Sequence, residues 1–221
     1  MRVTEHLYIY FWENQRENNC NSIFIDGKVP LLIDPGHAHH SPSLFSRMIE
    51  DGVSPSGIMM VLCTHAHPDH FGGTLAFRDS PARIAISRQE EQFIETVGKA
   101  LYAEQGKSLP SYRVDFHVAE GDLQIGKHQF QVFLTPGHSP GSLSLYWPRH
   151  KVLITGDVVF MQGVGRADLP GGNSADLVQS VERLSKLPTE LLIPGHGPAV
   201  QGTVEVQRNF QFVKKAFLNK S

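Results

Sequence analysis

The sequence predicts a single α/β domain, and two kinds of segment carry this prediction. Short apolar stretches bounded by turn residues, such as 6–12 and 20–26, are typical of strands. Longer segments, such as 174–187, repeat apolar residues at helical spacing. The chain has 221 residues, enough to bury a sizeable core and fewer than the length at which several domains become the default. We therefore expect one domain over residues 1–221.

The first third of the chain is expected to consist of strands. An antiparallel meander is predicted there because three short apolar segments are joined by tight turns. A continuous apolar run at 58–63 then lacks polar alternation, which indicates a strand covered on both faces. A short helix over 70–77 follows it. The strands of this part are expected at 6–12, 20–26, 29–33, 58–63 and 83–86.

The rest of the chain adds the longer helices. One amphipathic helix is predicted between Arg88 and Gly106, and another over 174–187 with Asn173 or Ser174 as its cap. A closing helix is indicated by apolar residues spaced by four, three and four positions, namely Val206, Phe210, Val213 and Phe217. Further strands are expected at 129–134, 142–146, 151–154 and 190–193.

Composition and charge exclude several classes of protein. The chain has 20 Lys and Arg residues against 22 Asp and Glu residues, and this net charge of −2 lacks the basic excess typical of nucleic-acid binding. No stretch approaches the roughly 20 apolar residues of a membrane span, and residues 1–12 lack an apolar run of signal-peptide length. Cys20 and Cys63 are too few for a disulfide scaffold. We expect a cytoplasmic protein without nucleic-acid or membrane partners, with Cys63 as a small buried strand residue.

Three histidines and an aspartate lie within six residues directly after the strand at 58–63. They are His65, His67, Asp69 and His70. Imidazole nitrogens and carboxylate oxygens are the side-chain ligands that divalent zinc, iron and manganese prefer. Four such groups are more than one open catalytic ion needs. The cluster therefore suggests a site for two ions.

Three further residues of ligand type share the same sequence context. His138, Asp157 and His196 each follow an apolar strand and a glycine-containing turn. Taken singly, His138 could be an exposed turn residue and Asp157 could cap the next segment. Loops at the carboxyl ends of strands are, however, where open α/β sheets place their ligands. We therefore expect four loops to converge on one cleft.

This order of motifs resembles the metallo-β-lactamase superfamily, and within it the glyoxalase II-like branch. The resemblance covers nearly the whole chain and implies a four-layer αββα sandwich, with two mixed sheets face to face and helices outside. It also implies a dinuclear metal centre at one edge. Its ligands would be His65, His67 and His138 for the first ion, Asp69, His70 and His196 for the second, and Asp157 as the bridge.

Two adjacent divalent ions would explain why such ligands are gathered. A pair about 3.5–4 Å apart shares a hydroxide, lowers its pKa from near 16 toward 7, and polarises a carbonyl group. This chemistry suits hydrolysis of an ester, thioester, amide or phosphodiester. Zinc is the expected metal, with iron or manganese as alternatives. Besides binding metal, Asp69 is a candidate for proton transfer and is therefore counted with Asp157 as catalytic.

The resemblance also narrows the substrate. Enzymes of this fold that hydrolyse β-lactams commonly have a cysteine where this chain has Asp157, which disfavours an antibiotic hydrolase. The segment 163–172 looks like a G-R-x-D-x-P-G-G motif of short bacterial glyoxalase II-like proteins, in which Arg166 would reach the glutathione part of a thioester. Alternatively, Arg166 pairs with Asp168 and orders the loop. Longer glyoxalases II carry an aromatic residue where this chain has Pro198, which speaks against glutathione.

A second histidine-rich segment follows the third expected strand. The resemblance places its Asp34-Pro35-Gly36 turn near the metals, so that Asp34 would orient a ligand histidine. His37, His39 and His40 are interpreted as a polar surface loop, with a wall of the active site as the alternative.

We therefore expect a dinuclear metallohydrolase for a small ester or thioester, with S-lactoylglutathione as the best single substrate. One rival is a persulfide dioxygenase with a single ferrous ion at His65, His138 and Asp157. Another is a non-catalytic protein that holds metal for structure, although structural sites are usually closed and rich in cysteine. The oligomeric state is left open.

Overall fold

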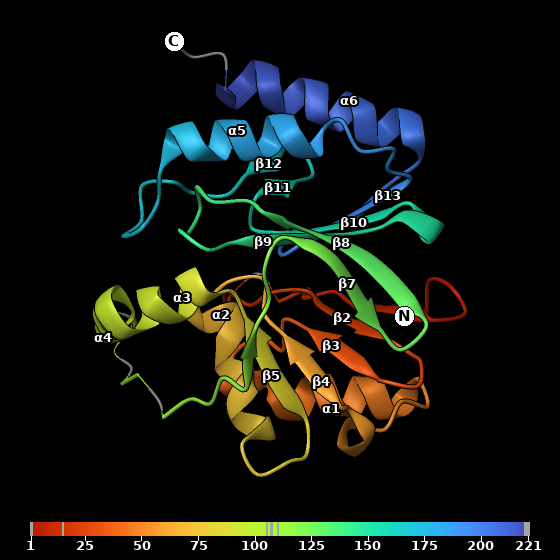
Figure 1. Cartoon of the computed structure of the whole chain (residues 1–221), viewed down its shortest axis with the longest axis vertical. Helices are drawn as coiled ribbons and strands as arrows, with labels where there is room; N and C mark the ends of the chain where they lie inside the picture. Colours follow the sequence, from red (N-terminus) through yellow and green to blue (C-terminus); the bar gives the residue numbers. More distant parts are fainter. Residues whose placement is uncertain (1, 15, 105, 107, 110, 219–221) are drawn as a thin grey trace.

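The fold consists of two β-sheets packed face to face, with helices on both outer faces (Figure 1). This computed structural model describes residues 2–14, 16–104, 106, 108–109 and 111–218. The four-layer αββα sandwich that the family resemblance implies is confirmed. No helix in the described residues is both long and apolar enough to cross a membrane.

The first sheet has six strands in chain order. The pairs β1–β2 and β2–β3 are antiparallel, as expected for a meander, whereas β3–β4, β4–β5 and β5–β6 are parallel. The carboxyl ends of β3, β4 and β5 therefore meet at one edge. The strands are β1 Leu7–Tyr10, β2 Ser22–Ile25, β3 Leu31–Ile33, β4 Met60–Leu62, β5 Arg83–Ile86 and β6 Phe116–His117.

The second sheet also has six strands, in the order β14-β13-β10-β9-β8-β7. Only the pair β10–β13 is parallel. A separate two-stranded ribbon pairs β11 with β12. The strands are β7 Gly121–Ile125, β8 His128–Leu134, β9 Leu143–Trp147, β10 Val152–Gly156, β11 Val159–Phe160, β12 Gly163–Val164, β13 Leu191–Pro194 and β14 Val200–Gln201.

The core lies in three layers because strand residues alternate between two buried faces. In β2, Ile23 and Ile25 point between the sheets, whereas Phe24 points toward the helices outside. In β10, Ile154 joins the layer between the sheets and Leu153 joins the layer under the opposite helices. Both faces of each sheet are therefore covered, which explains the nearly uninterrupted apolar runs in the sequence.

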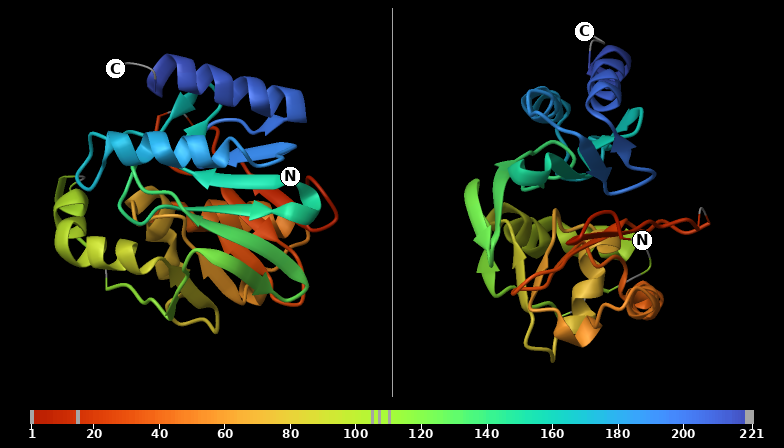
Figure 2. Two further views of the ribbon diagram at one scale, coloured as in Figure 1. Left: turned by 45° about the horizontal axis from the view of Figure 1, so that its top comes forward. Right: turned by 90° about the vertical axis from the view of Figure 1, so that its right-hand side faces the viewer.

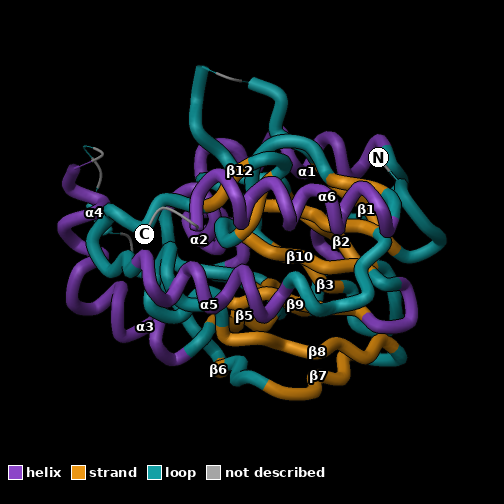
Figure 3. Tube along the Cα trace, turned by 90° about the horizontal axis from the view of Figure 1, so that it is seen from above, coloured by secondary structure: helices purple, strands orange, loops and turns teal. Residues whose placement is uncertain are grey.

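Helices cover the outer face of each sheet. Figure 2 shows α5 and α6 on one side of the paired sheets and α1 on the other, and the view from above in Figure 3 shows α5 and α6 running alongside each other. Leu177 and Val181 of α5 and Phe210 of α6 are buried there. The helices are α1 Ser41–Glu50, α2 Pro68–Phe71, α3 Arg88–Phe93, α4 Lys99–Glu104, α5 Ser174–Leu184 and α6 Thr203–Val213.

The observed elements differ from the expected ones in several places, and the strands β6, β7, β11, β12 and β14 were not expected. No element was expected in residues 41–57, where α1 begins at Ser41. The helix expected between Arg88 and Gly106 is divided by a π-helical segment at Ile94–Gly98, and Gln105 lies outside the described residues. Phe217, expected on the buried stripe of the closing helix, is 46% exposed because it lies in the π-helical segment Lys214–Leu218, which changes the residue spacing.

The two phenylalanines of the closing helix provide a test of this packing. Phe210 is buried to 1% exposure, so Phe210→Ala should leave a cavity and lower the free energy of unfolding by about 3–5 kcal/mol. Phe217→Ala should change it by less than about 0.5 kcal/mol because that ring is already hydrated. Urea denaturation of both variants measures the difference. Equal losses would contradict the described helix packing.

Candidate metal centre

The ligand-type residues of the sequence lie on four loops that follow strands. The segment 64–70 follows β4, and His138, Asp157 and His196 follow β8, β10 and β13. The structure brings these loops from the two sheets to one edge of the sandwich. Six of the seven residues are buried, namely His65, His67, Asp69, His70, His138 and Asp157, and the side chain of His196 is 24% exposed.

Backbone hydrogen bonds fix the loops relative to one another. Leu143 N–H of the second sheet donates to Thr64 O of the first at 2.8 Å. Gly195 N–H donates to Gly156 O at 2.8 Å, which ties the loops after β13 and β10 together. Asn21 N–H in turn donates to Gly195 O at 2.6 Å. The neighbouring Cys20 N–H donates to Asp69 O at 3.3 Å, and Leu143 directly follows the loop of His138, so that the four loops form one cross-linked unit.

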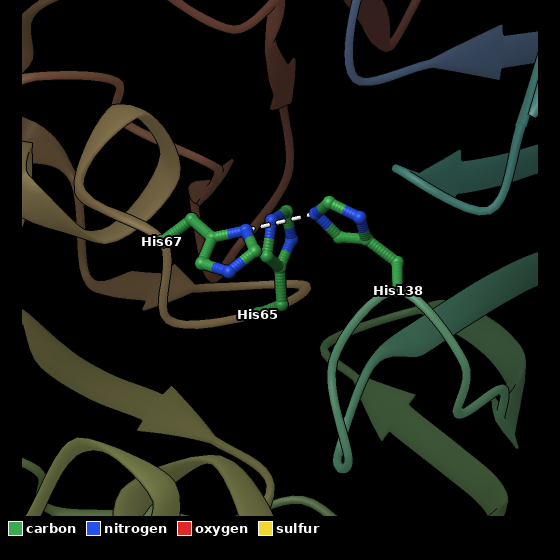
Figure 4. A group of neighbouring side chains, drawn as sticks. All are labelled: His65, His67 and His138. Carbon is green, nitrogen blue, oxygen red and sulfur yellow. Dashed lines mark hydrogen bonds between the residues drawn. The ribbon is translucent and has the colours of Figure 1, made fainter. Parts of the chain in front are cut away.

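The first group of possible ligands consists of His65, His67 and His138. Figure 4 shows His65 and His67 on one loop and His138 on another, with His67 Nδ1 2.8 Å from His138 Nε2. His138 Nδ1 lies 2.7 Å from the carbonyl oxygen of Arg166, which can only accept. His138 therefore carries its proton on Nδ1 and turns the lone pair of Nε2 toward the other two rings. One donor atom of each residue lies within 4.8 Å of the others.

The second group consists of Asp69, His70 and His196, whose donor atoms also lie within 4.8 Å of one another. The nitrogens His70 Nε2 and His196 Nε2 are 3.3 Å apart. Two nitrogens bound to one zinc ion at about 2.0–2.1 Å in tetrahedral geometry lie about 3.3 Å apart. His196 Nε2 is 3.2 Å from Asp69 Oδ2. This spacing suits a shared ion.

Asp157 lies between the two groups. Its Oδ2 is 3.5 Å from His138 Nε2 and 3.3 Å from His196 Nε2. Its Oδ1 is 3.2 Å from His70 Nε2. One carboxylate thus faces members of both groups, as a residue that bridges two ions must.

Asp34 orients two of the histidines, His70 directly and His65 through Thr64. Its Oδ2 accepts hydrogen bonds from His70 Nδ1 at 2.9 Å and from Thr64 Oγ1 at 2.7 Å, and its Oδ1 accepts one from Thr64 N–H at 2.7 Å. The Thr64 hydroxyl is 3.1 Å from His65 Nδ1 and accepts from it. Both imidazoles are therefore held with Nε2 turned toward the site.

The protonation of the site reflects burial and charge together. Burial lowers the pKa of His67 to about 4, with the neighbouring His138 adding to the effect. Burial also opposes the charged form of His196, but Asp157 outweighs it and raises the pKa of His196 to about 9. For Asp157, burial raises the pKa, and the charges of His70 and His196 overcome it, so that the pKa falls well below its usual range. The second group therefore carries protons that a metal ion would displace.

Two observations indicate that the site fits metal ions. His65 Nε2 is buried without a hydrogen-bond partner among the described residues, although its other nitrogen is fixed by Thr64. Such a group costs about 1–3 kcal/mol unless something binds it. At Gly195, a side chain would collide with Asp157 Oδ1 and approach His70 Cε1 to 2.7 Å. Glycine thus keeps the space between these donors open.

Comparison with known proteins agrees with this geometry. The family model described as the metallo-beta-lactamase superfamily matches residues 16–196. The chain belongs to this superfamily. It is 34% identical over 187 residues to the probable metallo-hydrolase YqgX of Bacillus subtilis, which covers 81% of this chain and 85% of the relative.

Two further proteins illustrate the range of the superfamily. The hydroxyacylglutathione hydrolase GloC of Haemophilus influenzae is 29% identical over 188 residues, covering 82% of this chain and 86% of that protein. The crystal structure of the BLEG-1 B3 metallo-beta-lactamase aligns with a TM-score of 0.77 at 27% identity, covering 94% of this chain and 99% of that one.

Glu90 is a buried residue of this superfamily member that the sequence analysis missed. Its Oε2 accepts a hydrogen bond from Ala66 N–H and its Oε1 accepts one from Gly141 N–H, each at 2.7 Å. Burial raises the pKa of Glu90, and hydrogen bonds to the carboxylate, led by that from Ser139, offset part of the rise. Glu90 therefore holds the loop of His65 and that of His138 at a fixed separation. The charged residues next to it in the sequence are typical of an exposed helix, so the positioning role of Glu90 is evident only from its complete burial in the structure.

Arg166 contributes to the site chiefly through its backbone. The carbonyl oxygen fixes His138, whereas the guanidinium is 67% exposed and forms two hydrogen bonds with Asp168, at 2.8 and 2.9 Å. The pairing that the sequence analysis gave as the alternative to a glutathione contact is thus present. Arg166 also lines a cleft of about 500 Å³ over the candidate metal centre, together with Leu169 and Phe160.

Three further residues are placed by the structure, two of which, Asn18 and Pro198, lie beside the candidate metal centre. Asn18, which the sequence analysis did not single out, donates from Nδ2 to Asp69 Oδ2 at 2.5 Å. Pro198 lines a second groove of about 660 Å³ that meets the first cleft at Asn18 and His196. Cys63 is fully buried, and burial raises the pKa of its thiol well above the usual range. Its sulfur is therefore an inert part of the core.

The role of Glu90 predicts a defined mutational effect. Glu90→Gln keeps the shape of the side chain but turns its amide N–H toward the backbone N–H of either Ala66 or Gly141. We expect a loss of about 1–3 kcal/mol in unfolding free energy and weaker metal binding, because Ala66 lies between two possible ligands. Thermal unfolding and competitive chelation with a zinc indicator measure the two effects. The matched control is Glu91→Gln at a half-exposed neighbour. Wild-type metal affinity in Glu90→Gln would contradict the positioning role.

Proposed function

We propose that this chain is a dinuclear metal-dependent hydrolase that cleaves thioesters, with S-2-hydroxyacylglutathione compounds as the best single substrate class. The first ion would be held by His65, His67 and His138, and the second by Asp69, His70 and His196. The observation that carries the proposal is the position of Asp157, one carboxylate facing both groups at 3.2–3.5 Å. Zinc is the expected metal because nitrogen and oxygen ligands around an open site suit it.

The reaction adds water to the acyl carbon and breaks the carbon–sulfur bond, giving a carboxylic acid and a thiol. When bound, two divalent ions lower the pKa of water toward 7 and draw electron density from the carbonyl group. Asp157 would hold the two ion sites at a fixed separation. Asp69, which lines the cleft and accepts a hydrogen bond from Asn18, would receive a proton from water and return it to the leaving thiolate.

The choice of a thioester rests on the cleft and on a relative. The cleft has a volume of about 500 Å³, and both His138 and Arg166, whose exposed guanidinium is paired with Asp168, line it. The 29% identity to a hydroxyacylglutathione hydrolase supports a glutathione thioester as the first substrate to test. The two cysteines are free buried thiols, which suits a reducing compartment such as the cytoplasm.

Metal content tests the dinuclear proposal. Protein purified without added metal should contain two ions per chain by mass spectrometry, chiefly zinc. Asp157→Ala should remove the bridge, lower the metal content, and reduce thioester hydrolysis by at least 100-fold with an unchanged circular dichroism spectrum. Asp122→Ala, at an exposed position of β7, is the control and should behave like wild type. Unchanged turnover in Asp157→Ala would refute the bridging role.

A substrate panel separates the proposed reaction from its alternatives. S-lactoylglutathione, an acyl-coenzyme A, an aryl ester, a lactone, a β-lactam and a phosphodiester are compared by kcat/KM, with oxygen uptake on glutathione persulfide alongside. The glutathione thioester should rank first. One iron per chain together with oxygen uptake would replace the proposal by a persulfide dioxygenase.

The glutathione contact of Arg166 is tested on its own. Arg166→Ala removes the guanidinium and keeps the carbonyl that fixes His138, so kcat should change little. We expect KM for a glutathione thioester to rise about tenfold, because a charge-assisted contact contributes about 1.5 kcal/mol, and KM for an aryl thioester to stay the same. Asp168→Ala, which frees the guanidinium, should not raise either KM. Equal effects of Arg166→Ala on both substrates would rule out the contact.

A further inference from the structure

A second group of metal-ligand side chains lies outside the candidate metal centre. Glu17, His39 and His40, called the outer cluster below, each offer one donor atom, and these atoms lie within 4.8 Å of one another. His40 Nε2 is 2.9 Å from Glu17 Oε2, and the ring centroids of His39 and His40 are 4.0 Å apart. The outer cluster shares no residue with the seven described above. We propose that it is a third metal site, selective for a late first-row transition ion such as Cu(II), Ni(II) or Zn(II).

The donor set determines which ions this site would accept. Two imidazoles and one carboxylate suit copper, nickel and zinc, and Cu(II) binds most tightly to a given set of such ligands. Calcium and magnesium instead require six or more oxygen ligands, and Glu17 supplies one carboxylate. Glu17 and His39 are exposed and His40 is partly buried, so water can complete the coordination of an ion. The outer cluster is therefore an open, exchangeable site.

The two chain segments that carry these donors are already held together. Asn19 Oδ1 accepts a hydrogen bond from His37 N–H at 2.7 Å, which ties the loop of Glu17 to the turn of the histidines. Trp12 Nε1–H donates to Glu17 O at 2.8 Å, and the Trp12 ring lies 4.3 Å from that of His40. An ion would thus bind to a prearranged site and would not have to order a free loop, which lowers the entropic cost of binding.

The position of Trp12 provides a direct signal of binding. The chain has only two tryptophans, and the other, Trp147, is buried between the sheets at 1% exposure. Protein whose candidate metal centre is filled with zinc is desalted and then titrated with Cu(II). Tryptophan fluorescence, bound copper and retained zinc are measured at each step. We expect quenching that saturates at one copper per chain while two zinc ions per chain, those of the candidate metal centre, are retained.

Variants assign the signal to the outer cluster. His39→Ala, at an exposed position that should not disturb folding, is expected to weaken copper binding at least tenfold, and Glu17→Gln several-fold. Trp12→Phe should abolish most of the quenching but still bind one copper. His117→Ala is the matched control, because it removes a histidine paired with Glu91 elsewhere on the surface at 2.5 Å and should leave copper binding unchanged.

Electron paramagnetic resonance of the bound copper should show coupling to two nitrogens in the wild type and to one in His39→Ala. Three results would each overturn the proposal. These are copper bound only when the zinc content falls below two ions per chain, His39→Ala binding copper as tightly as wild type, and no copper retained beyond the candidate metal centre.

Discussion

The buried carboxylate of Asp34 is the interaction on which the candidate metal centre depends. At 1% exposure a carboxylate without partners would destabilise the fold by several kcal/mol, and here donors from Thr64 and His70 satisfy it. These hydrogen bonds join the end of β3 to the loop after β4. They also set the rotation of His70 directly and that of His65 through the Thr64 hydroxyl. One acidic side chain therefore links the strand framework to the direction in which two possible ligands point.

Other hydrogen-bond acceptors around the site likewise hold the possible ligands or their loops in place. The Arg166 carbonyl fixes His138, and Glu90 holds the loops of His65 and His138 together. Each partner is supplied by a different part of the chain, so the geometry survives only when both sheets are packed. Without an ion, protons on the second group balance the negative charge of Asp157 and Asp69. Binding of two cations in place of those protons would couple metal affinity to the stability of the sandwich.

Sequence patterns predicted most of the longer strands and helices and the grouping of ligand-type residues, because these depend on local features, whereas the layers were implied only by the family resemblance. An apolar strand followed by a glycine turn and a histidine is visible at His138 without any tertiary information. Residues whose role arises only from packing were missed. Glu90 lies in a helix rich in polar residues, and its burial comes from two loops distant in sequence. Helix α1 was missed although Leu44 and Met48 have helical spacing, since the histidine-rich segment before it indicated a loop. Phe217 was misplaced because a π-helical turn alters the spacing on which the stripe was counted.

The central claim is that Asp157 bridges two ions held by separate residue sets. Anomalous diffraction from crystals of the zinc-loaded protein, recorded on both sides of the zinc absorption edge, tests it most directly. The account predicts two peaks about 3.5–4 Å apart, one in contact with His65, His67 and His138 and the other with Asp69, His70 and His196, with an oxygen of Asp157 in contact with each. A single peak, or two peaks of which one has no contact with Asp157, would contradict it.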